Sequence, residues 1–76
     1  MKSPGVITLL TDFGQQGGFV GALKGVIFSI NPNVQIVDVS HEVAPQNVFQ
    51  AALTLFVNYR YFAKDTIHVA VVDPGV

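Results

Sequence analysis

The alternation of short apolar runs with stretches of helical periodicity constrains the fold of this chain more than any other feature. Residues 6–10 read VITLL, residues 34–39 read VQIVDV, and residues 66–72 read TIHVAVV. Short runs that are nearly continuous in apolar residues are typical of strands buried on both faces of a parallel sheet. We therefore predict three strands at these positions.

The two segments between the predicted strands have helical spacing. Residues 19–30 carry apolar side chains along one helical face, and Asn31-Pro32 ends the pattern. A second helix is predicted up to about Asn58, with Asn47 as its N-cap and Gln50 completing a capping box. Its apolar residues cover so much of the circumference that we expect burial on more than one side.

The order of these elements, β-α-β-α-β, predicts an α/β fold. Strands that alternate with helices of this length pair in parallel through right-handed crossovers. The succession is one half of a doubly wound, Rossmann-like sheet. We expect residues 1–76 to form an incomplete N-terminal portion of a larger domain.

Composition points the same way. Half of the 76 residues are apolar, 12% are charged, and none is cysteine. A compact unit of this size buries only about 60% of the surface that its unfolded chain exposes, and small domains usually need disulfides or metals to compensate. We therefore expect the chain either to oligomerise through an apolar surface or to be part of a larger fold.

Charge and spacing exclude several function classes. With four basic residues and a net charge of −1, the chain lacks the Lys/Arg cluster that nucleic-acid binding requires. No apolar run approaches the roughly 20 residues of a spanning helix. The apolar run near the start of the chain is too short for the hydrophobic region of a signal peptide. His41 and His68 lie too far apart for a zinc-ligand pair, so we predict no metal. The expected compartment is the cytoplasm.

Acidic residues follow the predicted strands. Asp12 comes after the first, Asp38 and the segment 40–42 mark the second, and Asp73 follows the third, with no Lys or Arg beside them in the sequence. Ligands of open α/β sheets bind at this carboxyl edge. Carboxylates there disfavour phosphate but accept hydrogen bonds from a vicinal diol. The residues thus predict a phosphate-free, nucleoside-like ligand that can carry positive charge.

Each of these residues also has a structural interpretation. Asp12 can cap a loop, and Asp73 can be the first residue of a turn with Pro74-Gly75. Asp38 is expected to hydrogen-bond a neighbouring loop, and His41 to close a loop through backbone hydrogen bonds. His68, in the middle of a predicted strand, is expected to be structural.

Five strings extend the interpretation to a family: LTDFG (10–14), VGALKGVI (20–27), INP (30–32), IVDVSHEV (36–43) and VVDPGV (71–76). In this order and spacing they resemble the start of the S-adenosylmethionine hydroxide adenosyltransferases, whose relatives include the fluorinating and chlorinating enzymes. The resemblance covers essentially the whole chain. It implies hydrolysis of S-adenosylmethionine to adenosine and methionine, with S-adenosylmethionine as substrate and no cofactor.

The resemblance also implies roles for individual residues. Asp12 matches the family acid that binds the ribose hydroxyls, and Asp73 matches the first member of an Asp-Arg-His set that holds the attacking water. Phe13, Phe19 and Gln46 are expected to contact the substrate, Gln46 in place of a fluorinase tryptophan. The family's arginine and histidine lie beyond Val76.

Two further expectations come from the family. Its active site forms between the N-terminal domain of one subunit and the C-terminal domain of a neighbour in a trimer, so the 76 residues alone are expected to be inactive. A carboxylate at Asp73 would repel a halide and favour water, which makes hydrolysis the preferred reaction over halide transfer. A non-catalytic nucleoside-binding or assembly module, and a plain Rossmann-like half-domain, are the alternatives.

Overall fold

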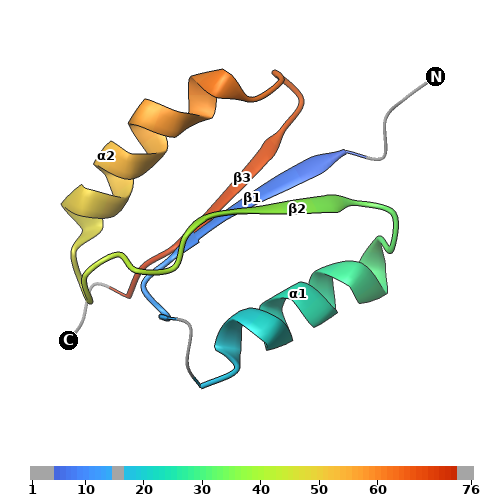
Figure 1. Ribbon diagram of the computed structural model, residues 1–76, viewed down its shortest axis with the longest axis horizontal. Coiled ribbons are helices and arrows are strands. Elements are labelled where there is room, and N and C mark those ends of the chain that lie inside the picture. Colours follow the sequence, from blue (N-terminus) through green and yellow to red (C-terminus); the bar gives the residue numbers. More distant parts are fainter. Residues whose placement is uncertain (1–4, 15–16, 74–76) are drawn as a thin grey trace.

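The computed structural model describes residues 5–14 and 17–73, and within them every predicted strand and helix is present. The chain forms β1 (Val6–Thr11), α1 (Phe19–Ile30), β2 (Gln35–Ser40), α2 (Val48–Asn58), a 3₁₀ turn at Tyr59–Tyr61, and β3 (Ile67–Val71) (Figure 1). Five of the six strand ends differ from the predicted ones, each by one residue. The 3₁₀ turn was not evident from the sequence.

The three strands form one parallel sheet in the order β2-β1-β3. The chain leaves β1 toward one side to reach β2, and then crosses back over β1 to reach β3. Right-handed crossovers in opposite directions put their helices on opposite faces, and Figure 1 shows α1 and α2 on the two sides of the sheet. The α/β fold class is confirmed.

Strand β1 is the centre of the sheet and holds most of the core. Leu9 and Leu10 are almost fully buried, and Leu10 packs with Val43 and with Ala51 of α2. Ala51 is the one residue of α2 that is buried among the described residues. The expectation that α2 is buried on more than one side is therefore wrong for this chain: the outer part of its apolar stripe is exposed, at Phe49, Leu53, Phe56 and Val57.

The start of α2 shows half of the predicted capping box. Asn47 Oδ1 accepts a hydrogen bond from Gln50 N at 2.9 Å, which confirms the N-cap. The Gln50 side chain accepts instead from Ala44 N at 2.8 Å, while Asn47 N donates to Ala44 O. Gln50 thereby ties the loop after β2 to the helix.

Both helices are short, at 12 residues for α1 and 11 for α2. Over the described ranges, the chain has no helix with the length and apolar content that a membrane crossing requires.

Candidate functional site

Asp12 lies where the chain changes direction across the sheet, at the carboxyl ends of β1 and β3. Its backbone N donates to Val71 O at 3.3 Å. Its carboxylate Oδ2 accepts two long hydrogen bonds, from Asp73 N at 3.3 Å and from Gln46 N at 3.5 Å. One side chain thus joins the ends of two strands and the loop before α2. Ligands of doubly wound sheets bind at this kind of switch point.

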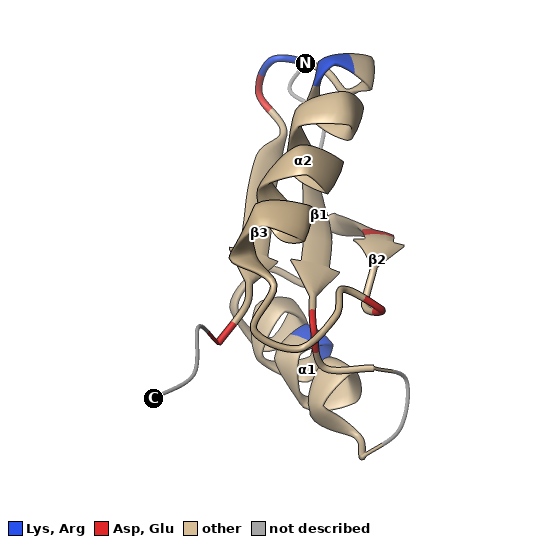
Figure 2. Cartoon of the chain, turned by 90° about the vertical axis from the view of Figure 1, so that its left-hand side faces the viewer, with Lys and Arg blue, Asp and Glu red and all other residues tan. Residues whose placement is uncertain are grey.

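Figure 2 shows acidic positions at the ends of β1 and β3 and a basic position on α1, and it shows basic and acidic positions together beyond the far end of α2. No hydrogen bond to Asp12 Oδ1 is found among the described residues. The carboxyl edge therefore presents a hydrogen-bond acceptor of negative charge, as the sequence predicted.

Gln46 adopts an uncommon backbone conformation beside Asp12. Its φ of 67° lies in the left-handed region, which residues other than glycine seldom adopt. This conformation directs the backbone N–H of Gln46 toward Asp12 Oδ2. The contact that the structure shows for the predicted site residue Gln46 is therefore made by its backbone, and its side chain is exposed.

The two predicted aromatic residues lie close together. The rings of Phe13 and Phe19 have centroids 6.0 Å apart and are tilted by 50°, within the range of favourable aromatic pairs. Gly17 and Gly18, with φ of 87° and 77°, lead the chain into α1 at Phe19. Phe19 is 65% exposed, so an apolar surface flanks the acidic edge.

Asp73 follows β3 and is exposed. Its backbone N–H is held by Asp12. The turn predicted with Pro74-Gly75 lies outside the described residues. The structure thus brings the backbone N–H groups of Gln46 and Asp73 each into contact with the Asp12 carboxylate. Phe13 follows Asp12 in the chain and pairs with Phe19.

Asp38 does have a basic neighbour, contrary to the expectation from the strand ends. Lys24, from the middle of α1, lies with its Nζ 2.6 Å from Asp38 Oδ2, and His41 Nε2 lies 2.8 Å from Asp38 Oδ1. Partial burial opposes ionisation of Asp38, but the hydrogen bonds from Lys24 and His41 outweigh it and hold its pKa below the ordinary value of 3.8. Lys24 could not be identified from the strand ends, because it lies on α1, 14 positions before Asp38.

The structure gives both histidines structural surroundings. His41 O accepts from Gly14 N at 2.7 Å, which confirms the predicted loop closure. His68 Nδ1 lies 2.7 Å from Thr8 Oγ1, and its ring contacts that of Phe62 edge-on. The described residues contain no group of three or more metal-ligating side chains.

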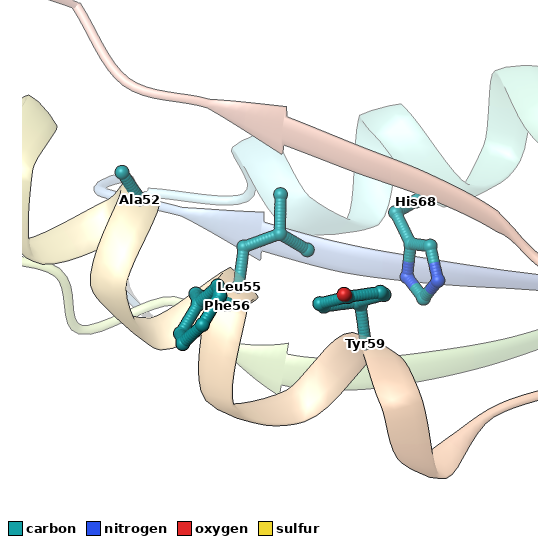
Figure 3. Close-up of a pocket in the computed structure, with 5 residues that line it drawn as sticks. All are labelled: Ala52, Leu55, Phe56, Tyr59 and His68. Carbon is teal, nitrogen blue, oxygen red and sulfur yellow. The ribbon is translucent and has the colours of Figure 1, made fainter.

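A hollow of about 390 Å³ lies away from the acidic edge, between α2 and β3. Figure 3 shows the His68 ring beside Tyr59 on this face, with side chains of α2 completing the lining: Ala52, Leu55 and Phe56. Its walls are apolar and aromatic apart from His68, which already pairs with Thr8. It offers little of the polar contact that fixes a ligand, so the acidic edge is the candidate site.

Comparisons with known proteins agree with this geometry. The chain is 45% identical over 75 residues to an (R)-S-adenosyl-L-methionine hydrolase of Methanocaldococcus jannaschii, covering 93% of the chain and 28% of that protein. It is 32% identical to a fluorinase of an Actinoplanes species, covering 92% and 24%. A crystal structure of an uncharacterized conserved protein from Thermotoga maritima superposes with a TM-score of 0.88 at 43% identity, covering 92% of the chain and 27% of that one.

The chain thus spans less than a third of the length of each of these proteins. Residues 7–76 match the profile described as the SAM hydroxide adenosyltransferase N-terminal domain. Together with the parallel sheet and the acids at its switch point, this match to the N-terminal domain shows that the chain belongs to the SAM hydroxide adenosyltransferase family.

Proposed function

We propose that this chain supplies the ribose-binding part of an enzyme that hydrolyses S-adenosylmethionine to adenosine and methionine. The observation that carries the proposal is the contact between Asp12 and Asp73 at the switch point of the sheet. In the proposed reaction the oxygen of water forms a bond to the ribose 5′ carbon while the bond from that carbon to sulfur breaks. The sulfonium takes up the electron pair and leaves as the neutral thioether of methionine, and the water loses one proton.

Each acid has a distinct proposed role. The carboxylate of Asp12 accepts hydrogen bonds from the two ribose hydroxyls, and charge-assisted bonds of this type are about twice as strong as neutral ones. The carboxylate of Asp73 accepts a hydrogen bond from the attacking water and helps to remove its proton. S-adenosylmethionine is the proposed substrate. Because it carries its own leaving group, the sulfonium, the proposed reaction includes no cofactor.

Water is preferred over halide as the nucleophile. A carboxylate at Asp73 repels an incoming anion and orients a water molecule. Relatives of both kinds exist, but the chain is 45% identical to a protein named as a hydrolase and 32% identical to one named as a fluorinase. These identities support the hydrolase over the halide-using transferase.

Two further elements of the proposal concern assembly. We propose a homotrimer, as the family resemblance implies. We also propose that residues outside this chain complete the active site, because the chain spans only 28% of the hydrolase that it resembles. A cytoplasmic location stays a prediction from the sequence. The alternative function is a non-catalytic nucleoside-binding or assembly module, which the exposed apolar residues of α2 favour, at Phe49, Leu53 and Phe56.

The test is to incubate the complete gene product with S-adenosylmethionine and to separate the products by chromatography, with and without added fluoride or chloride. We expect adenosine and methionine in both cases. A halogenated nucleoside would favour the transferase. Saturable binding of adenosine in calorimetry without any turnover would favour the binding module. The absence of both binding and turnover would contradict the proposal.

The same assay tests the expectation that residues 1–76 are inactive alone. We expect no adenosine from the 76-residue chain under conditions in which the complete gene product is active. Adenosine formation by the short chain would contradict the proposed need for residues outside it.

A further inference from the structure

His41 is a buried polar side chain that the proposed reaction does not use. It is 1% exposed, and it sits beside Thr11, which is fully buried at the end of β1. The His41 Nδ1 lies 2.8 Å from Thr11 Oγ1, and the same Oγ1 accepts a hydrogen bond from Phe13 N at 3.2 Å. His41 is therefore linked through the Thr11 hydroxyl to the backbone of Phe13, the residue that follows Asp12.

Hydrogen bonds link this cluster from Thr11 to Lys24. The carboxylate of Asp38 can only accept, so the His41 ring donates from Nε2 to Asp38 Oδ1. At the other ring nitrogen, Nδ1, the Thr11 hydroxyl is the partner, and Thr11 Oγ1 also accepts from Phe13 N. Lys24 Nζ donates to the other Asp38 oxygen.

An irregularity in the sheet brings these residues together. Leu9 pairs with Asp38, but Leu10 pairs with Ser40, so β2 holds one extra residue at Val39. Val39 turns toward the apolar cluster under α2. Because of the extra residue, His41 rather than Ser40 lies level with Thr11. Bulges of this kind often lie next to active sites, where they redirect a side chain.

The backbone adds two links between the same loops. Gly14 N donates to His41 O at 2.7 Å, and Val43 N donates to Thr11 O at 3.4 Å. The segment that contains Asp12 and Phe13 is thus bound to the segment after β2 on both sides. Side-chain and backbone bonds together fix the direction in which Asp12 leaves β1.

We propose that His41 is a positioning residue: with Asp38 and Thr11 it holds the turn after β1, so that the Asp12 carboxylate and the Phe13 ring are in place before the ribose arrives. This inference rests on the proposed function, in which Asp12 binds the ribose. Preorganisation of this kind favours binding because less conformational freedom is lost when the ligand binds. Asp38 and Lys24 act through the histidine and do not themselves contact the substrate.

The experiment replaces Thr11 by valine, which has the same shape without the hydroxyl, in the complete gene product. The control is Thr8→Val: Thr8 is also on β1, is 1% exposed, and pairs with His68 Nδ1 at 2.7 Å. We expect Thr11→Val to raise the dissociation constant of adenosine about tenfold, the equivalent of one network hydrogen bond. Thr8→Val should leave it unchanged, and Thr11→Ser should restore it to within about twofold because the hydroxyl is retained.

A second readout separates this inference from the proposed function. Hydrogen exchange at the amides of Phe13 and Gly14 should accelerate about tenfold in Thr11→Val and stay unchanged in Thr8→Val. Unchanged exchange and unchanged adenosine affinity in a folded Thr11→Val would overturn the positioning role. A wild-type protein that neither binds nor forms adenosine would overturn the proposed function, whereas the exchange result would still decide the role of His41 in the turn.

A variant outside the core covers the case in which Thr11→Val does not fold. Asp38 has a side chain that is 39% exposed, so Asp38→Asn is expected to fold. Its loss of charge weakens the hold on His41, and we expect the adenosine dissociation constant to rise about threefold, part of the effect of one hydrogen bond. An Asp38→Asn protein with wild-type adenosine affinity and wild-type Phe13 exchange would contradict the proposal.

Discussion

Two threonine–histidine pairs on the same strand illustrate how location decides the role of a contact. Thr8 pairs with His68 at 2.7 Å on the α2 face of β1, and Thr11 pairs with His41 at 2.8 Å at its carboxyl end. Both threonines are buried. The two contacts are chemically the same, and their bond lengths do not distinguish them.

The surroundings of the two histidines differ. His68 has aromatic neighbours: its ring centroid lies 5.7 Å from that of Phe62, and Tyr59 lies beside it in the hollow of Figure 3. His41 instead contacts the carboxylate of Asp38, which also pairs with the ammonium group of Lys24. The first pair stabilises the packing of β3 on β1, and the second joins charged groups to the turn that presents Asp12. Substitutions in the first region should therefore change stability, and those in the second should change ligand binding and turnover.

The largest expected effect is at Asp73. Asp73→Asn in the complete gene product removes the carboxylate that we propose accepts the proton of water, and adenosine formation should fall by about an order of magnitude or more. The control is Asp65→Asn, which changes an exposed carboxylate before β3, at the opposite end of the strand. Rates are measured by chromatography of adenosine. Near-normal turnover of Asp73→Asn would exclude the proposed role.

Asp12 should affect binding more than the rate of the chemical step. Asp12→Asn keeps the shape of the side chain but loses the charge that would strengthen the proposed hydrogen bonds to the ribose hydroxyls. We expect the adenosine dissociation constant to rise about tenfold or more, as for the loss of a charge-assisted hydrogen bond. Calorimetry measures this, and equal affinity of variant and wild type would place the ribose elsewhere.

Thr8→Val should change stability without changing binding. The substitution leaves His68 Nδ1 without its described hydrogen-bond partner, and the free energy of unfolding should fall by about 1 kcal/mol. Urea denaturation followed by circular dichroism measures the loss. If adenosine affinity fell together with stability, the two threonine–histidine pairs would not be functionally distinct.

The smallest effect concerns pH. The pKa of Asp38 in the folded chain is below the 3.8 of its unfolded state, so its ion pair stabilises the fold fully above pH 3.8 and this contribution is lost as the pH falls below 3.8 through the folded pKa. The difference in unfolding free energy between wild type and Asp38→Asn should shrink over that range. Glu42→Gln, which changes an exposed neighbouring acid, is the control and should show a smaller change. An Asp38→Asn difference that is constant with pH would exclude the ion pair as its cause.

The sequence predicted the elements well because their signals are local. Periodicity placed α1 at Phe19–Ile30, and the cap at Asn47 placed the start of α2. The 3₁₀ turn at Tyr59–Tyr61 has no comparable signal. The burial of α2 was predicted wrongly, because an apolar stripe indicates what a helix can bury and not what lies against it in this chain.

The candidate site was predicted in part. Asp12 and Asp73 were found because acids at the carboxyl ends of parallel strands meet at one edge. The contact of Gln46 through its backbone could not be predicted, since it depends on a left-handed φ in a residue other than glycine. Lys24 was missed because a helix brings it to Asp38 across 14 positions of the chain.

The sequence by itself therefore determined the class of the fold, the order of its elements and the acids at the carboxyl edge of the sheet, since each follows from residue type and short-range spacing. Tertiary structure alone decided which side chains meet. The strand order β2-β1-β3 placed Asp12 against Asp73, and one extra residue in β2 brought His41 level with Thr11. Contacts of this kind depend on register, which shifts every later side chain when a strand gains a single residue.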